Sequence, residues 1–408
     1  LARLRGGKGS GAPGVVANRI APGLLPSVLG SFPDGLIVVS GTAGKSTTTK
    51  MLAALLRAHG VRVFTNSSTA NLPQGITSAI LDQGDARGRI DADIAVIEMD
   101  EAHGARLAPQ FTARAVVLTN VMLDDLERFQ TMDRVAQMLG EIAERATELV
   151  VVNADDASLD AIAGSTSARG VTVGRYGVGQ GVLDEQPHGL GYARVADARL
   201  TPADGCLVVD VDGEHAELQL AGHGIEIGLP SRGTHFAVDA AAALETARLL
   251  LGERFAPATA VAAMNAVEPV FGRGETVTID GQQIDFVLVQ NTASFQLNLD
   301  VVSGSHELLF LAIGEEEHDP SWLWTVHPAA LGRVDIAAGP KAQDLAVRLL
   351  YAGVEVVEVE RDLHTAFDRF LAMPTPAGGR KTAMFTASQM RELRRVHGLV
   401  KAELEGGH

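Results

Sequence analysis

The sequence predicts an α/β protein with two parallel β-sheets covered by helices and a small β-rich segment between them. Strand-like apolar runs alternate with helix-like runs from residue 36 to about residue 155, and a second alternation begins near residue 276. Residues 170–228 instead carry glycines and short alternating runs. Strands that alternate with helices are typical of parallel sheets, whereas short alternating runs favour antiparallel hairpins.

The chain has 408 residues, which is enough for several domains, each with its own core. We expect an N-terminal lead segment at residues 1–35, a central domain at 36–270 with the β-rich insertion at 170–228, and a C-terminal domain at 271–408. The connection at 269–274 contains proline and glycine, which are typical of a boundary.

In the central domain, the apolar runs predict strands at residues 36–39, 61–65, 94–98, 115–119 and 149–153. Helical periodicity predicts helices at 46–58, 75–81, 132–146, 235–251 and 257–266. Within the β-rich segment, Asp212 and Gly213 suit a hairpin turn. Ligands of parallel sheets bind beyond the carboxyl ends of the strands.

The C-terminal domain is expected to be a smaller Rossmann-like α/β domain. Its apolar runs predict strands at residues 285–289, 308–313, 334–337, 354–358 and 383–385. Its periodic segments predict helices at 342–351, 363–371 and 388–399.

Composition excludes several classes of function. The net charge of −16 argues against nucleic-acid binding, which depends on a basic surface. No apolar run is long enough to cross a bilayer, and the first residues lack a secretory signal, so we expect a cytoplasmic protein. Cys206 is the one cysteine, which excludes an internal disulfide and a multi-thiolate zinc site. We interpret it as a small buried hydrophobe.

A phosphate-binding loop lies between the first strand and the first helix of the central domain. Its residues are Gly41, Thr42, Ala43, Gly44, Lys45, Ser46 and Thr47. Glycines turn backbone N–H groups toward an anion, and a helix N-terminus favours negative charge. Lys45 would reach the β- and γ-phosphates of ATP, and Ser46 would hold Mg²⁺. The alternative is an ordinary strand–loop–helix connection.

Polar side chains follow the next strands at the same edge of the expected sheet. Glu98 ends one strand and precedes Asp100 and Glu101, Asn120 follows another, and Asp155 follows a third. A triphosphate enzyme needs carboxylates that hold Mg²⁺, and Glu98 is the first candidate. A solvated acidic loop is the alternative for the acidic run. The hydroxyl and amide residues at 66–71 suit a polar substrate, or form a plain turn.

These motifs, in this order, resemble the Mur ligase family, and within it the MurT-type subunits. The resemblance rests on the phosphate loop, on 65–73, on the Glu-x-Asp-Glu-Ala run at 98–102, and on Phe271-Gly-Arg-Gly-Glu275. It continues through Asp319-Pro-Ser-Trp-Leu-Trp324 and the segments at 345–353 and 382–395. It therefore covers residues from about 36 to 400.

The resemblance implies an ATP-dependent amide synthesis. The α-carboxylate of D-glutamate in the lipid II stem peptide, at the membrane surface, would become an acyl phosphate, and ammonia would convert it to D-isoglutamine. A separate GatD-type glutaminase in a heterodimer would supply the ammonia. Lys45 and Glu98 would be catalytic, Asn120, Arg273 and Asn291 would join the loop in binding ATP, and Asp319 would complete the catalytic triad of the partner. Trp322 and Trp324 beside it suit an interface or a core.

Several positions depart from the family pattern. The family usually carries a four-cysteine zinc ribbon, so this chain is expected to bind no zinc. Ala43, Phe236, Asp239 and Gln290 replace usual residues of the nucleotide pocket, and Thr325 replaces an Asp. Two alternatives therefore stay open: a paralogue that acts on another carboxylate, and a weakly catalytic binding subunit. A Mur-type amino-acid ligase is a further rival, although it should carry a UDP-substrate domain before the loop.

Overall fold

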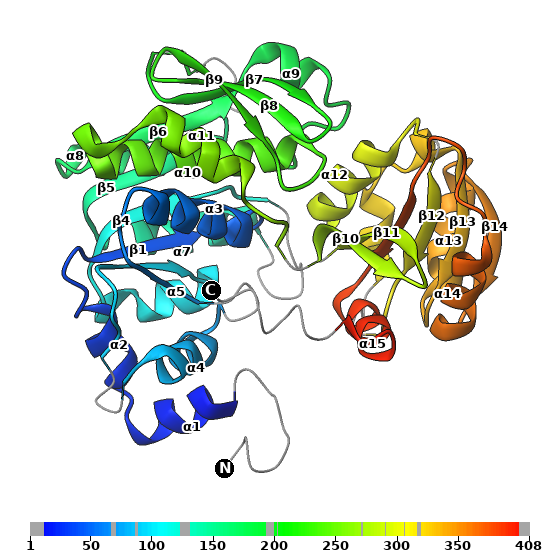
Figure 1. Cartoon of the computed structure of the whole chain (residues 1–408), viewed down its shortest axis with the longest axis horizontal. Helices are drawn as coiled ribbons and strands as arrows, with labels where there is room; N and C mark the ends of the chain where they lie inside the picture. The colour runs from blue at the N-terminus through cyan, green and yellow to red at the C-terminus, as the bar shows by residue number, and fades with distance from the viewer. Residues whose placement is uncertain are drawn as a thin grey trace.

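The computed structural model describes residues 12–66, 71–85, 89–122, 131–192, 200–201, 203–270, 272–289, 291–305, 307–315 and 320–399. It contains a nine-stranded sheet and a six-stranded sheet. Figure 1 shows them as two lobes, the larger running from blue to green and the smaller from yellow to red. The α/β fold expected from the sequence is therefore confirmed.

The nine-stranded sheet has the order β2-β3-β1-β4-β5-β6-β7-β8-β9. Its strands are β1 Leu36–Ser40, β2 Val63–Thr65, β3 Ile94–Glu98, β4 Ala113–Leu118, β5 Ala146–Asn153, β6 Thr172–Val178, β7 Cys206–Asp212, β8 His215–Leu220 and β9 His223–Gly228. Strands β2 to β7 pair in parallel, and β7 to β9 pair antiparallel. The β-rich segment thus continues the central sheet.

The hairpins expected over 170–228 occur only in part. The turn at Asp212 and Gly213 joins β7 to β8 as expected. The hairpin expectation is wrong for β6, which lies in parallel between β5 and β7. Periodicity within one strand does not decide its pairing direction, which for β6 depends on the neighbouring strands.

Helices cover both faces of this sheet. One core packs α3 Lys45–Ala58, α10 Thr234–Leu251 and α11 Pro257–Asn265 against it, and the opposite core packs α2 Leu24–Leu29, α4 Pro73–Gln83, α7 Met132–Ala143 and α8 Ala157–Ala168. Helix α1 Ala12–Ile20 contacts α4. Helix α5 Glu101–Leu107 and helix α9 Gln180–Asp184 are short.

One predicted helix is too long, and two helices were not predicted. The helix expected at 132–146 ends at Ala143, because Ala146 already begins β5. Helices α5 and α8 were not predicted, and each begins after an aspartate whose side chain accepts backbone N–H bonds, Asp100 and Asp156 respectively. Such N-caps stabilise short helices whose apolar pattern is weak.

The six-stranded sheet has the order β10-β11-β15-β12-β13-β14. Its strands are β10 Arg273–Ile279, β11 Gln282–Leu288, β12 Leu308–Ala312, β13 Arg333–Ala338, β14 Glu355–Glu360 and β15 Lys381–Phe385. Only β10 and β11 pair antiparallel. Helices α12 Thr292–Val302 and α13 Ala342–Tyr351 pack on one face, and α14 Leu363–Ala372 and α15 Ala387–Val396 pack on the other. The sequence did not predict β10 or α12.

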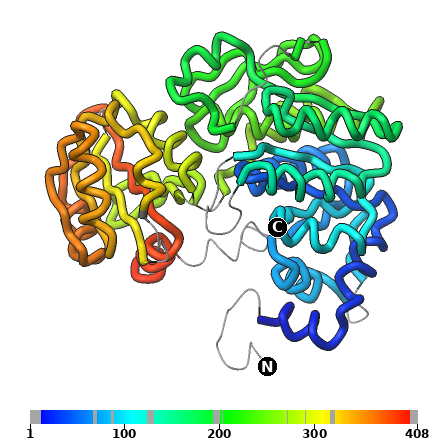
Figure 2. The backbone as a smooth tube through the Cα atoms, turned by 180° about the vertical axis from the view of Figure 1, so that it is seen from behind, coloured from blue at the N-terminus to red at the C-terminus, as the bar shows by residue number. Residues whose placement is uncertain are grey.

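Polar contacts link the two units near the connection between them. Arg232 donates to Glu307 at 2.6 Å and to Asp285 at 3.3 Å. Lys50 on α3 donates to the carbonyl of Pro269 at 3.1 Å. Figure 2 shows from behind that the green segments lead directly into the yellow lobe. Among the described residues, no helix combines the length and the apolar character that crossing a membrane requires.

Candidate nucleotide-binding site

The loop between β1 and α3 has a backbone that only glycine can adopt at two places. Gly41 and Gly44 have φ values of 134° and 81°. A Cβ atom on Gly41 would lie 2.1 Å from the hydroxyl oxygen of Thr119, and one on Gly44 would lie 2.1 Å from Oδ1 of Asp239. Positive φ and close neighbours therefore both require glycine. The loop leads directly into the N-terminus of α3, which favours anions.

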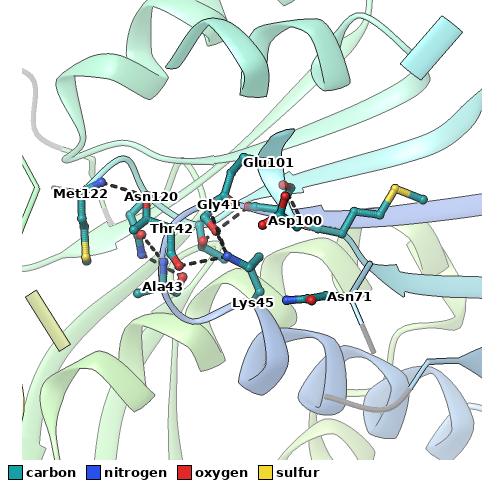
Figure 3. A network of polar contacts seen from close by, with 12 residues as sticks. Gly41, Thr42, Ala43, Lys45, Asn71, Asp100, Glu101, Asn120 and Met122 are labelled. Atoms are coloured by element: carbon teal, nitrogen blue, oxygen red, sulfur yellow. Dashed lines mark hydrogen bonds and ion pairs between the residues drawn. The ribbon is translucent and has the colours of Figure 1, made fainter. Parts of the chain in front are cut away.

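The ammonium group of Lys45 lies inside this loop. It donates to the carbonyl oxygen of Gly41, to that of Thr42 at 3.0 Å, and to Oε1 of Glu101 at 3.2 Å. Figure 3 shows these contacts. The Lys45 side chain is 12% exposed and that of Glu101 is 2% exposed. A cation is thus held where a bound phosphate would need one.

Asn120 supports the loop from the end of β4. Its Oδ1 accepts from the backbone N–H of Ala43 at 2.9 Å, and its Nδ2 donates to the carbonyl of Ala43 at 3.1 Å. The N–H of Met122 also donates to the hydroxyl of Thr42 at 3.1 Å. These contacts, drawn in Figure 3, fix the loop conformation. Through these contacts Asn120 therefore acts on the loop backbone.

Ser46 and Glu98 are brought together although they lie far apart in the sequence. The Ser46 hydroxyl donates to Oε2 of Glu98 at 2.8 Å, and Asn71 donates to Oε1 at 3.2 Å. Burial raises the pKa of Glu98, and the charge of Lys45 opposes that effect. A hydroxyl and a carboxylate are ligands that suit Mg²⁺, which keeps several waters and substrate oxygens as further ligands.

Among the described residues, no group of three or more histidine, cysteine or acidic side chains could hold a metal ion. Magnesium sites with one or two protein oxygens take their further ligands from substrate phosphates and water. Cys206 is fully buried, and burial raises the pKa of its thiol well above the usual value. The interpretation of Cys206 as a small hydrophobe is confirmed.

A cavity begins at Gly44, Ser46 and Thr47 and extends between the two sheets. Phe236 and Asp239 on α10 line it, together with Arg273 on β10. Apolar walls come from both units, and they include Met122, Leu190, Val238, Val287 and Leu297. The cavity therefore joins an anion-binding loop to an apolar slot, which is the arrangement that a nucleotide requires.

Charged groups surround this cavity. Burial lowers the pKa of Arg273, and the charges of Glu98 and Asp239 oppose that effect. Burial, with a smaller effect from Arg273, lowers the pKa of His235 to about 4. Burial also raises the pKa of Asp239 well above its usual value. Sequence reasoning assigned Asp239 no role beyond its departure from the family pattern, although an aspartate in an alanine-rich helix was a signal.

The two remaining expected site residues are Asn291 and Asp319. Asn291 caps α12, where its Oδ1 accepts from the N–H of Ser294 at 2.8 Å. Ser294 lines the cavity. Asp319 lies outside the described residues. The expected site therefore divides into a cluster around the phosphate loop, a helix cap in the other unit, and a position that the structure does not describe.

The two tryptophans have different surroundings. Trp322 is partly buried and packs edge-on against Phe295, with ring centroids 5.7 Å apart. Trp324 is 51% exposed, and it contacts Tyr351 edge-on at 5.4 Å while Arg348 lies over its ring at 5.5 Å. Tyr351 is 79% exposed and Leu350 is 60% exposed. Trp322 thus packs in the core, whereas Trp324 belongs to an exposed aromatic patch.

Comparisons with a family model and with known proteins point to the same family. The Mur ligase middle domain matches residues 39–247. The MurT subunit of lipid II isoglutaminyl synthase (glutamine-hydrolyzing) from Staphylococcus aureus strain COL is 25% identical over 400 residues, covering 89% of this chain and 88% of that protein. The MurT subunit from Streptococcus pneumoniae strain R6 is 26% identical over 386 residues, covering 86% and 84%.

Solved structures share the fold. MurF ligase from Thermotoga maritima in complex with ADP has a TM-score of 0.66 and 19% identity, covering 93% of this chain and 82% of that chain. Folylpolyglutamate synthase from Mycobacterium tuberculosis, complexed with ADP and AMPPCP, has a TM-score of 0.63 and 17% identity, covering 95% and 98%.

Proposed function

Because the chain belongs to the Mur ligase family, we propose that it is the synthetase subunit of a glutamine-dependent amidotransferase. The resemblance to MurT is confirmed by relatives that cover most of the chain. Those relatives and the shared fold support an ATP-dependent, Mur-ligase-like synthetase, that is, a ligase of peptidoglycan biosynthesis. Its proposed substrate is the α-carboxylate of D-glutamate in the lipid II stem peptide, and its proposed product is D-isoglutamine.

The contact between Ser46 and Glu98 beside Lys45 is the observation that carries this proposal. In the reaction, a carboxylate oxygen of the substrate attacks the γ-phosphorus of ATP, and ADP leaves with the electron pair of the broken P–O bond. Ammonia then attacks the carbonyl carbon, and phosphate leaves with the broken C–O bond while the nitrogen loses a proton. The ammonium of Lys45 offsets charge on the transferred phosphoryl group. Magnesium held by Ser46 and Glu98 would supply further charge neutralisation.

The position of Lys45 fits this role. Its three oxygen contacts hold the ammonium in the loop, as described above. An incoming phosphate can replace carbonyl contacts with stronger charge-assisted bonds. Gly41, Gly44 and Thr47 would supply backbone N–H groups, whereas the N–H of Thr42 donates to the carbonyl of Asn120 at 3.0 Å. Arg273 would add a second cation at the cavity. Asn120 would act by holding the loop, and Asn291 by placing α12 at the cavity wall.

We propose that the ammonia comes from a separate GatD-type glutaminase in a heterodimer. Cys206 is the chain's one cysteine, and it is fully buried with a raised pKa, so it is unsuited to attack glutamine. The exposed patch formed by Trp324, Leu350 and Tyr351 has the aromatic character of an interface. Asp319 precedes it by five residues and would complete the partner's triad.

The organisation of the chain follows from the same proposal. We propose that a central ATP-binding domain extends to residue 270 and that the C-terminal domain begins at residue 271. We also propose a cytoplasmic protein that meets lipid II at the membrane surface. The alternative substrate is another carboxylate, which Phe236 and Asp239 favour because they change the cavity wall. A weakly catalytic binding subunit is the second alternative.

Reconstitution tests the proposal. The full chain and a GatD-type glutaminase should convert lipid II with D-glutamate to the D-isoglutamine form when ATP, Mg²⁺ and glutamine are present, and mass spectrometry would detect the product. The chain alone should do so with ammonium ions in place of glutamine. Nucleotide binding without amidation of lipid II would favour another carboxylate substrate. Failure to bind any nucleotide would refute the synthetase itself.

A further inference from the structure

A buried carboxyl group lies directly against the phosphate loop. Asp239 is 6% exposed, and its Oδ1 would be 2.1 Å from a Cβ placed on Gly44. Its helix, α10, packs along α3 in the same core. The carboxyl also lines the cavity that begins at this loop. An acid therefore sits where the loop geometry favours anions, which is an unusual combination.

Charge alone makes an ionised Asp239 unfavourable beside a bound triphosphate. Two anions in a low-dielectric cavity repel each other strongly, and an acid next to another anion keeps its proton to higher pH. Burial already raises the pKa of Asp239, and the positive charge of Arg273 opposes this effect. Arg273 is, however, shared with Glu98. Nucleotide phosphates would also interact with Arg273, which would raise the pKa of Asp239 further.

The other groups that face Asp239 do not reverse this conclusion. Burial raises the pKa of Tyr176 on β6 well above 10.0, and the charge of Asp239 adds to this effect. The Tyr176 hydroxyl donates to the carbonyls of Leu118 and Thr119 at 2.9 Å. It is therefore neutral. His235 on the same helix has a pKa of about 4 and is also neutral near pH 7. The hydroxyl groups of Thr47 and Thr48 on α3 lower the pKa of Asp239, but their effect is smaller than that of burial, and they carry no charge.

We propose that Asp239 binds the nucleotide as a neutral carboxylic acid and donates its O–H to an acceptor atom of the nucleoside triphosphate seated at Gly44. This inference rests on the proposed nucleotide site. A neutral carboxyl presents one donor and one acceptor, as a carboxamide does, whereas a carboxylate only accepts. Asp239 would thus bind the nucleotide only in its protonated form. Nucleotide affinity would fall as pH rises, because ionisation removes the donor and adds a repelling charge.

Calorimetric titration of the full chain with the Mg²⁺ complex of AMPPCP tests this inference. In the alkaline range, above that in which phosphate groups titrate, wild-type affinity should fall by up to about tenfold per pH unit as the carboxyl ionises. Titrations in two buffers that differ in ionisation enthalpy should show proton uptake over the same range. Asp239→Asn should bind within about threefold of wild type near pH 7 and should lose both the pH dependence and the uptake.

Glu245→Gln is the matched control. Glu245 is a buried acid on the same helix, its pKa is raised by burial, and it pairs with Arg248 outside the cavity. This variant should keep the wild-type pH profile. Wild-type affinity that is constant with pH, without proton uptake, would overturn the inference even if Asp239→Asn failed to fold. Binding weakened at least about tenfold in Asp239→Asn at every pH would identify an ionised partner of Arg273 instead. Absence of nucleotide binding in wild type would refute the proposed function itself.

Discussion

The two sheets share an architecture but differ in what their edges carry. At the carboxyl ends of β1, β3 and β4, the nine-stranded sheet gathers the phosphate loop, Glu98 and Asn120. In the six-stranded unit, buried Asp335 pairs with Arg333, and the surface exposes Trp324 and Tyr351. The same layered fold therefore suits a phosphate-binding loop in one unit and a contact surface in the other. Loops and surface residues, rather than the fold, make that difference.

Two buried aspartates show the contrast in detail. Asp156 accepts from the backbone N–H groups of Val121 at 2.7 Å and Ser158 at 2.9 Å, and burial raises its pKa to about 6. Asp335 accepts from the N–H of Leu309 at 2.8 Å and also pairs with Arg333 at 2.8 Å. Asp156 thus holds the backbone that follows Asn120 through N–H groups, whereas Asp335 combines a backbone N–H group with an arginine.

The largest expected effect is a difference between amidation with glutamine and amidation with ammonium ions. Asp319→Asn should lower glutamine-dependent amidation by about 10⁴-fold, as loss of the carboxylate does in hydrolase triads. Ammonium-dependent amidation should remain unchanged, because Lys45, Ser46 and Glu98, which are proposed to carry out the synthesis, belong to the nine-stranded unit. Parallel assays with glutamine and with ammonium chloride measure both rates. Equal loss in both assays would place Asp319 in the synthetase site or in a structural role, and no change in either would make it a solvent-facing loop residue.

The second effect concerns the loop itself. Lys45→Ala should lower amidation by about 10²- to 10³-fold with either nitrogen source, because the transferred phosphoryl group loses its cation. Phosphate release and product formation would both be measured. Lys341→Ala, which removes a lysine at the start of α13 in the other unit, is the control and should keep full activity. Full turnover by Lys45→Ala would contradict the phosphate-binding assignment.

Stability should depend on pH through Asp156. Its folded-state pKa of about 6 exceeds its ordinary value of 3.8, so the folded state holds the proton over a range in which the unfolded state releases it. The free energy of unfolding of wild type should therefore fall, relative to Asp156→Asn, by about 1–3 kcal/mol as pH rises from about 4 to about 6, and should then stay level. Urea unfolding at several pH values measures this. A relative stability that rises through this window would contradict the burial argument.

The smallest expected effect tests the exposed patch. Trp324→Ala should weaken binding of the glutaminase by about tenfold, in line with aromatic contacts at interface centres. Affinity is measured by titrating labelled glutaminase with each variant. Leu81→Ala is the control, because Leu81 is 48% exposed on α4 in the other unit. Equal affinities for wild type and Trp324→Ala would move the interface elsewhere.

The sequence predicted the parts of the fold that follow from local pattern. Strands β1 and β3 and helix α13 have clear apolar patterns, and their positions agree with the prediction to within a residue. Strand β6 was misjudged, because its pairing partner is decided by tertiary contacts rather than by its own residues. Helix α8 was missed, because its start depends on the Asp156 cap.

The candidate site shows the same division. The loop sequence identified Lys45 and Ser46 as candidates, since glycine spacing and a helix start are local signals. The contact of Lys45 with Glu101, and the approach of Asp239 to Gly44, join residues from separate elements. Sequence spacing carries no information about such approaches. They depend on how α5 and α10 pack beside the loop.

The transfer of oxygen-18 from substrate to phosphate tests the central claim most directly. The wild-type complex would be supplied with lipid II that carries oxygen-18 in the α-carboxylate of D-glutamate, together with ATP, Mg²⁺ and ammonium ions. If the carboxylate attacks the γ-phosphorus and phosphate later leaves from the carbonyl carbon, each inorganic phosphate should carry one carboxylate oxygen. Mass spectrometry of the phosphate should therefore show the label in proportion to product. Product formed with unlabelled phosphate would contradict the acyl-phosphate account.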